Sequence, residues 1–424
     1  MKPTILMLPS WYPTPENPFV GSFFREQALV MQENFNFVVL TVRYKGELAC
    51  VRAVKNLFHI PVKPNLKFVQ DDNGLQEYCL TIRTPRFIIW DLLVQKFNSY
   101  VKKQRLPMGI GRIENHAIKN ARISAILYLK KNNLLPTFDC IYSLTSQDIA
   151  NLGNDFARMY KVPHVTAEHA PFPNPGQVLS DSIVEAIEKA DAFLAISNDK
   201  IRQVLLQNIK INPVWVGNYC DESRFRPSVE NHTTPTILIV GASSYIKNFP
   251  LFIRAMEELK QIATKDFKIM IAGYNANKEY SQSPKDLEEL VRCSSVRDNI
   301  TMIESVSRED MPALYNACDI FVMTSIQEGM PVSALEASMS GLPVITTRCG
   351  GVEDYIDDSM GRIVSITDYR GIAEACNQIL NGEIEFDRKH IREKTINIFG
   401  KEAFVSRISN VFFSVIEKNK RKLD

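Results

Sequence analysis

The chain lacks the sequence features that mark several common protein classes. Its eight cysteines are scattered and form no C-x-x-C pair, and several lie within apolar runs, which indicates free thiols in a reducing compartment. No run approaches the roughly 20 apolar residues of a membrane span, and the apolar stretch near the N-terminus is too short for a signal-peptide core. We therefore expect a cytoplasmic protein.

Two further absences narrow the function. No G-x-G-x-x-G fingerprint follows the first predicted strand, which argues against a bound dinucleotide such as NAD. The formal net charge of +2 is too small to indicate a nucleic-acid partner. The composition, with 45% hydrophobic and 23% charged residues, is that of an ordinary globular protein.

Short apolar runs alternate with helical patterns along most of the chain, as in parallel sheets with crossover helices. The strands predicted for the first half are Thr4–Leu8, Phe37–Val42, Asp139–Leu144, His164–His169, Ala192–Ser197 and Val214–Asn218. Those predicted for the second half are Thr236–Val240, Lys268–Gly273, Asn299–Glu304, Asp319–Ser325 and Pro343–Thr347. Residues 45–90 show no pattern that places their elements.

The chain of 424 residues is longer than one compact core usually grows, so two domains are expected. A polar linker, SVENHTTP, interrupts the alternation near residue 228. We predict an α/β protein with two doubly wound Rossmann-like domains, 1–227 and 228–400, facing across a cleft. Residues 401–424 are predicted to form an amphipathic helix that packs back toward the first domain.

The stretch Ser325–Gly341 carries the most specific pattern in the chain. Glu328 is expected on a loop at the carboxyl end of a strand, and Glu336 inside a helix that begins near Pro331. At about 1.5 Å rise per helical residue, the two carboxylates lie on the order of 10 Å apart. That separation suits hydroxyls on two sugar rings, although a surface unit with two solvated glutamates shows the same spacing.

Three loops at the ends of predicted strands are suited to an anion. Gly241–Lys247 follows a strand and precedes a helix, so its amides and the Lys247 ammonium are placed to hold a phosphate. The helix near Pro331 points its amides toward the same edge, and Cys349–Asp354 adds a glycine-bearing loop. Arg348 and Arg362 are further cations nearby in sequence. Together these features predict a diphosphate site.

The first half contributes a loop and a polar pair to the same cleft. A Pro-rich loop that contains Gly21 follows the first strand, and Glu168 and His169 end a later strand just before another Pro-rich loop. Ligands of open α/β sheets bind at the carboxyl ends of strands, which makes both segments candidate walls of the site. A lone histidine is also commonly structural, so both roles stay open for His169.

The span 91–131 is strongly basic. It contains Asp91 and Glu114 as its acidic residues, against the cations Lys96, Lys102, Lys103, Arg105, Arg112, Lys119, Arg122, Lys130 and Lys131. Apolar and aromatic residues precede the run, which fits a peripheral contact with an anionic membrane surface. A solvated helix face is the alternative.

These motifs resemble those of glycosyltransferase family 4, whose members have the GT-B fold, and the resemblance covers almost the whole chain. The segments that carry it are PSWYP, GSFFREQ, EGMPVSALE, GLPVITT, GGVEDYI, GRIV and Ile396–Ala403. The resemblance implies retaining transfer of a sugar from a UDP- or GDP-sugar to a glycan or lipid-linked acceptor, in cell-surface polysaccharide synthesis. A GT-B-like sugar nucleotide epimerase and a non-catalytic sugar-binding protein are the alternatives.

The resemblance also implies roles for single residues. Glu328 binds hydroxyls of the donor sugar, Glu336 binds the ribose, and Lys247 holds the diphosphate. His169 lies beside the sugar, and Ile303–Val306 contacts the base. The other implied donor-binding positions, which supply backbone contacts, are Gly21, Gly241, Gly329, Met330, Pro331, Val332 and Ser333.

Two positions depart from the family pattern. Ala242 stands where the family often has arginine, so Arg25 or Arg348 is expected to help meet the diphosphate charge. Ser305 stands where glycine is common. The remaining possible site residues are Glu168, Gly350 and Gly351. No Asp-x-Asp occurs, so neither a metal nor a cofactor is expected.

Overall fold

The computed structural model describes residues 2–14, 20–48, 63–72, 74–86, 108–173, 178–228, 234–276 and 283–423. The strands of the first lobe are β1 (Thr4–Pro9), β2 (Asn36–Leu48), β3 (Asn65–Asp72), β4 (Leu75–Arg86), β5 (Cys140–Leu144), β6 (His164–Glu168), β7 (Ala192–Ala195) and β8 (Pro213–Trp215). Those of the second lobe are β9 (Thr236–Val240), β10 (Lys268–Ala272), β11 (Ile300–Ile303), β12 (Ile320–Met323), β13 (Val344–Thr347) and β14 (Gly361–Val364).

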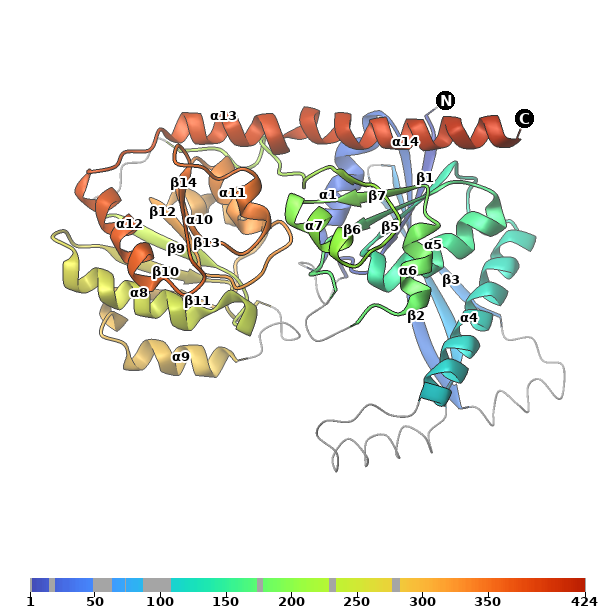
Figure 1. Ribbon diagram of the computed structural model, residues 1–424, viewed down its shortest axis with the longest axis horizontal. Coiled ribbons are helices and arrows are strands. Elements are labelled where there is room, and N and C mark those ends of the chain that lie inside the picture. Colours follow the sequence, from blue (N-terminus) through green and yellow to red (C-terminus); the bar gives the residue numbers. More distant parts are fainter. Residues whose placement is uncertain are drawn as a thin grey trace.

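Helices cover both sheets (Figure 1). The α-helices of the first lobe are α1 (Ser22–Val30), α4 (Met108–Lys131), α5 (Ser146–Tyr160), α6 (Asp181–Glu188) and α7 (Asn198–Leu206). The second lobe has α8 (Phe249–Ile262), α9 (Pro284–Cys293), α10 (Met311–Asn316), α11 (Val332–Met339), α12 (Tyr369–Asn381) and α13 (Arg388–Phe399), and α14 (Lys401–Leu423) follows. Short 3-10 turns are η1 (Met31–Glu33), η2 (Tyr245–Lys247), η3 (Arg297–Asn299) and η4 (Gly351–Asp354).

Each lobe contains one open, doubly wound sheet. The first has the strand order β3-β4-β2-β1-β5-β6-β7-β8, and the second β11-β10-β9-β12-β13-β14. Strand neighbours run parallel, with β3 antiparallel to β4 at one edge. The predicted fold class is confirmed.

The span 45–90, which the sequence left without elements, extends β2 and adds the β3–β4 hairpin. Its strands lie at the edge of the sheet, where apolar residues alternate with polar ones; Leu75 and Leu80 are buried, whereas Phe68 is 57% exposed. A half-exposed edge hairpin does not produce the continuous apolar runs that identified the central strands. The missed hairpin therefore reflects its position in the sheet.

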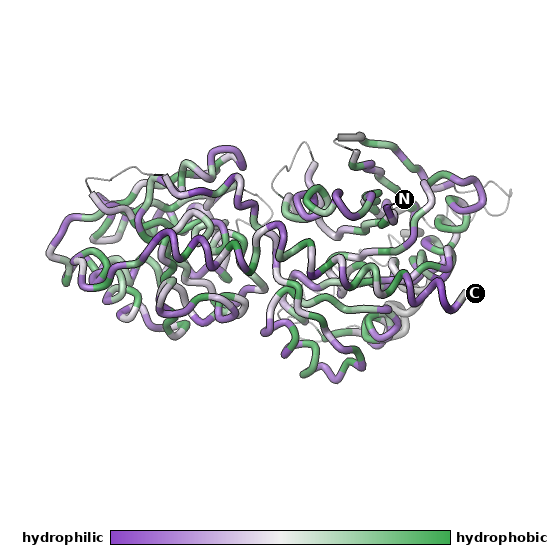
Figure 2. Tube along the Cα trace, turned by 90° about the horizontal axis from the view of Figure 1, so that it is seen from above, coloured by the Kyte–Doolittle hydropathy of each residue, from purple (hydrophilic) through white to green (hydrophobic). Residues whose placement is uncertain are grey.

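The last two helices run along both lobes (Figures 1 and 2). Helix α13 packs in the second lobe, where Ile391 and Phe399 join the core. Helix α14 places Phe404, Ile408 and Phe412 in the core of the first lobe, and the ring of Phe412 lies 5.1 Å from that of Tyr142. Residues four apart lie on one helix face, so the amphipathic tail covers the first sheet.

The segment that connects the two lobes joins the hydrophobic core of the second lobe before the predicted domain boundary. Cys220 and Phe225 precede the predicted boundary near residue 228, yet both pack with residues of the second lobe. Asp354 of the second lobe accepts hydrogen bonds from the backbone N–H of Asn198 at 2.7 Å and from the indole N–H of Trp215 at 3.1 Å. The two lobes therefore touch directly beside the connection.

Candidate functional site

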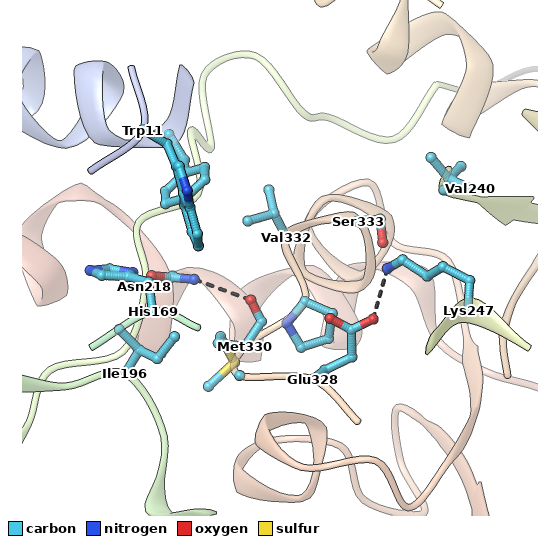
Figure 3. Close-up of a pocket in the computed structure, with 14 residues that line it drawn as sticks. Trp11, His169, Ile196, Asn218, Val240, Lys247, Glu328, Met330, Val332 and Ser333 are labelled. Carbon is cyan, nitrogen blue, oxygen red and sulfur yellow. Dashed lines mark hydrogen bonds and ion pairs between the residues drawn. The ribbon is translucent and has the colours of Figure 1, made fainter. Parts of the chain in front are cut away.

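A cavity of about 350 Å³ lies between the two lobes. Figure 3 shows Trp11, His169 and Asn218 on one side of it and Lys247 on the other. The first lobe lines it with Trp11, Phe23, His169, Ile196 and Asn218. The second lobe lines it with Val240, Gly241, Lys247, Glu328, Gly329, Met330, Pro331, Val332 and Ser333.

The strand topology explains why these residues meet. Trp11, His169 and Ile196 follow the carboxyl ends of β1, β6 and β7, which belong to one parallel sheet. In the second lobe, Gly241 follows β9 and Glu328 follows β12, its neighbour in the other sheet. Parallel strands end at one edge, so each sheet collects its loop residues there, and the two edges face each other.

Glu328 and Lys247 form the charged pair of the pocket. The Lys247 ammonium donates to Glu328 Oε1 at 2.7 Å, and the Ser325 hydroxyl donates to the same oxygen at 2.7 Å. The side chains of Lys247 and Glu328 are 22% and 16% exposed, respectively, so a ligand in the cavity can reach the pair. The backbone N–H of Ile326 donates to the carbonyl of Ile246 at 2.8 Å and ties the two loops together.

Glycines let two other loops approach the backbone of the Glu328 loop closely. A Cβ on Gly329 would lie 2.8 Å from the carbonyl oxygen of His169, across the interface between the lobes. Gly351, with φ +33°, would place its Cβ 2.3 Å from the carbonyl oxygen of Gly329. Both positions require glycine because the neighbouring atoms belong to the backbone and cannot move aside. Gly350 and Gly351 thus support the pocket from behind.

His169 occupies an apolar setting at the pocket wall. Its ring lies 4.8 Å from that of Phe24, edge to face, and 5.8 Å from that of Phe23. Both ring nitrogens are buried, and neither has a hydrogen-bond partner among the described residues. Burial, and then the nearby charge of Lys200, lower the His169 pKa to about 3. The imidazole is therefore neutral near pH 7, with one donor and one acceptor nitrogen left for a ligand.

Asn218 joins the two sides of the pocket. Its side-chain amide donates to the carbonyl of Met330 at 3.2 Å. Its Oδ1 is buried and, within the part of the chain that the structure describes, has no hydrogen-bond partner.

Glu336 does not line the pocket, although the sequence placed it with Glu328. It lies in the second turn of α11 and is 2% exposed. Its carboxylate accepts hydrogen bonds from Arg308 and, at 3.0 Å, from the hydroxyl of Tyr315. Burial raises the pKa of Glu336, and the Arg308 charge opposes that shift. Both oxygens are thus held by the protein itself.

Several other candidates also lie outside the pocket lining. Arg25 pairs with Glu77 at 3.0 Å, and Glu168 is fully buried behind His169. Ser305 and Arg348 are exposed on loops of the second lobe. Gly21 is the N-cap of α1 and packs against the backbone of Trp11. Neither Arg25 nor Arg348 is thus among the residues that line the cavity.

The basic span 91–131 is described in part. Residues 91–107 lie outside the described residues, and the rest of the span forms α4. Arg122 pairs with Asp155 at 2.6 Å, and Lys130 donates to the carbonyl of Met159, so two of its cations face the protein. In the described ranges, no helix has the length and apolar character to cross a bilayer.

Comparison with known proteins identifies the family. The family described as "Glycosyl transferases group 1" matches residues 221–397. An uncharacterised glycosyltransferase of Methanocaldococcus jannaschii is 30% identical over 312 residues, which cover 72% of this chain and 75% of the relative. The chain belongs to the group 1 glycosyltransferases. It is thereby a member of the GT-B glycosyltransferase superfamily.

Solved glycosyltransferase-like structures share the whole fold of this glycosyltransferase. Sucrose-phosphate synthase of Thermosynechococcus elongatus superposes with a TM-score of 0.70 at 16% identity, over 98% of this chain and 100% of that one. The Anabaena protein HepE, solved in complex with UDP, has a TM-score of 0.67 at 13% identity, over 98% and 100%. At these identities the likeness shows the fold alone.

The glycosyltransferase pocket contains five residues that the sequence did not predict as site residues. They are Trp11, Phe23, Ile196, Asn218 and Val240. Four of them lie at or soon after the carboxyl ends of predicted strands, so the rule that predicted Glu328 also applied to them. Phe23 lies on α1, and no signal beyond its place after the Gly21 loop pointed to it.

Proposed function

We propose that this glycosyltransferase transfers a sugar, with retention, from a UDP- or GDP-sugar to a glycan or lipid-linked acceptor. One observation carries the proposal: a single pocket joins Lys247 and the first turn of α11 on one lobe to His169 and Trp11 on the other. A cation and helix N-terminal amides suit a diphosphate. A neutral histidine and an aromatic ring suit a sugar.

The donor would exchange partners with the Lys247–Glu328 pair. Of the described residues that line the pocket, Lys247 is the cation, and it is bound to Glu328. A diphosphate would draw the ammonium away, and Glu328 would then accept hydrogen bonds from sugar hydroxyls. HepE, which shares the fold at 13% identity, was solved with UDP, so a UDP-sugar is among the donors to test. Glu336 remains our candidate for the ribose, for which it would have to exchange its bond to Arg308 or Tyr315, and Ile303–Val306 remains our candidate for the base.

The charge distribution suits a sugar that loses its diphosphate. As the bond breaks, negative charge grows on phosphate and positive charge on the sugar ring. Lys247 and the amides of α11 are already oriented toward the phosphate, so they would stabilise the transition state more than the ground state. Glu328 is the carboxylate of the described pocket lining, and we assign it to binding. Retention would then come from attack by the acceptor on the face that the phosphate leaves.

Consumption of the donor should depend on an acceptor and should need no metal. We expect one member of a UDP- and GDP-sugar panel to be consumed when a glycan or lipid-linked acceptor is added, with little turnover without it. EDTA should leave the rate unchanged, since Lys247 and the amides supply the positive charge. Chromatography of the released nucleotide measures both effects.

The same assay separates the alternatives. Conversion of the sugar nucleotide without an acceptor would indicate an epimerase. Binding without any turnover across the panel would indicate a sugar-nucleotide-binding protein. A rate lost in EDTA and restored by Mn²⁺ would contradict the absence of a metal.

We further propose a peripheral contact between the basic span 91–131 and an anionic membrane on the cytoplasmic side, which would bring a lipid-linked acceptor to the pocket. Of the described cations in α4, Lys119, Lys130 and Lys131 are exposed. The protein should sediment with anionic liposomes and be released as salt rises, because salt screens exposed charges. Neutral liposomes are the control, and equal binding to both kinds would contradict the contact.

A further inference from the structure

Two buried charged side chains hold the turn that carries His169. Directly after β6, Glu168 Oε1 accepts a hydrogen bond from the backbone N–H of Ala170 at 2.8 Å. On the other side, the Lys200 ammonium donates to the carbonyl of Ala170. Glu168 and Lys200 are both fully buried. The peptide groups of the residue after His169 are thus fixed by one anion and one cation.

Each charged side chain is anchored to a different helix. The second oxygen of Glu168 accepts from the Ser146 hydroxyl at 2.6 Å and from the Gln147 N–H at 3.2 Å, at the start of α5. Lys200 belongs to α7 and also donates to Gln203 Oε1 at 2.9 Å. Buried charges are costly unless they are hydrogen-bonded, and each of these side chains makes at least two hydrogen bonds.

The imidazole of His169 has no hydrogen bond of its own that would orient it. Its two nitrogens have no partner in the described ranges, and its ring touches the rings of Phe23 and Phe24. These ring contacts limit the space in which the imidazole can move, but the backbone turn sets the direction in which it enters the pocket. The carbonyl of His169 also packs against Gly329 of the other lobe, so a shift of the turn would disturb both pocket walls.

Resting on the proposed function, we propose that Lys200 and Glu168 are positioning residues that hold the turn after β6 so that the His169 imidazole is directed at the donor sugar. Neither touches the pocket, so both act through His169. A neutral imidazole can donate to one sugar oxygen without placing a cation beside a ring that becomes positive. A charged imidazole would oppose the transition state.

The surrounding charges support this role. Glu168 from β6 and Asp199 from α7 face Lys200, and both raise its pKa, although burial outweighs them and lowers it to about 8. Lys200 therefore carries a proton near pH 7. Its charge adds to burial in lowering the pKa of His169 to about 3. The cation behind the turn thus works against protonation of the imidazole.

Replacing Lys200 by methionine tests the proposal. Lys200→Met keeps an unbranched apolar side chain but removes the ammonium and with it the bonds to Ala170 and Gln203. We expect kcat to fall at least about tenfold with a smaller change in the donor KM, because a shifted catalytic group loses much of its effect. In NMR spectra of protein with ¹³C-labelled histidine, the ring signal of His169 is assigned by its absence from His169→Ala. In Lys200→Met its chemical shift should move toward that of free histidine, because the ring moves away from Phe24.

The His169→Ala background shows whether the effect passes through His169. If it does, adding Lys200→Met to His169→Ala should cost less than about twofold in kcat, since the group that it positions is gone. The matched control is Lys189→Met at the C-cap of α6, where the side chain is 63% exposed; it should change neither kcat nor the ring signal.

A second variant covers the case in which Lys200→Met fails to fold. Glu168→Gln with Lys200→Met removes both buried charges, which proteins commonly tolerate. It still lacks the donor to Ala170, so the loss of kcat and the shift of the ring signal should persist. An unchanged ring signal, or an equal loss of kcat with and without His169, overturns the proposal. The ring signal decides the matter even if the wild-type protein transfers no sugar.

Discussion

Glu328→Gln is expected to lower kcat/KM for the donor at least about 100-fold, or about 3 kcal/mol of transition-state stabilisation. Glutamine keeps the shape of the side chain but loses the charge that pairs with Lys247 at 2.7 Å. In our proposal that charge also accepts hydrogen bonds from the donor sugar. Lys247→Met should cost about as much, because the phosphate loses its cation.

Controls on the same lobe separate chemistry from folding. Glu289→Gln and Lys389→Met change side chains that are 59% and 83% exposed, and both should keep wild-type turnover. Thermal unfolding of all four variants, measured alongside turnover, shows whether a loss of activity comes from unfolding. Turnover near the wild-type value in either site variant would refute the assigned pocket.

The sequence predicted best where the strands are buried on both faces. Continuous apolar runs such as Thr4–Leu8 marked the central strands, and the loops at their carboxyl ends carry most of the pocket. The EGMPVSALE motif adds Glu328 and the first turn of α11 to the pocket, as expected for a loop between a strand and a helix. The edge hairpin β3–β4 was missed because half-exposed strands lack such runs.

Partner choice among charged side chains could not be predicted from the sequence. Spacing alone placed Glu328 and Glu336 at one site. In the structure, Glu328 pairs with Lys247, whereas Glu336 pairs with Arg308. Arg308 comes from the loop after β11, so the pairing depends on the tertiary packing of α10 and α11. Arg25 likewise pairs with Glu77 of β4, a strand whose position the sequence did not show.

Arg308→Met is expected to lower the free energy of unfolding by about 3 kcal/mol, because it leaves a buried carboxylate without its cation. Arg308 bonds Glu336 and also holds both oxygens of Glu26, on α1 of the first lobe, at 3.0 and 2.9 Å. Urea denaturation at fixed pH measures the loss. Glu26→Gln should cost less, since the Glu26 side chain is 22% exposed and can reach water.

The loss in Arg308→Met should depend on pH. Burial already raises the pKa of Glu336, and Arg308 opposes that rise, so its removal should raise the pKa further. A carboxyl whose pKa is higher in the folded state binds more protons there, so stability falls as pH rises above the unfolded pKa. The deficit against the wild type should therefore shrink from about pH 8 to about pH 5.

A double variant isolates the buried charge as the cause. Arg308→Met with Glu336→Gln removes both charges, and it should recover most of the lost stability and show little pH dependence. The hydroxyl of Tyr315, which lies 3.0 Å from Glu336, can still donate to a glutamine oxygen at that place. If the double variant were as unstable as Arg308→Met, the loss would come from the broken link to Glu26. Arg308 would then stabilise the protein mainly through its contact with Glu26 of the other lobe, rather than by pairing with the Glu336 carboxylate.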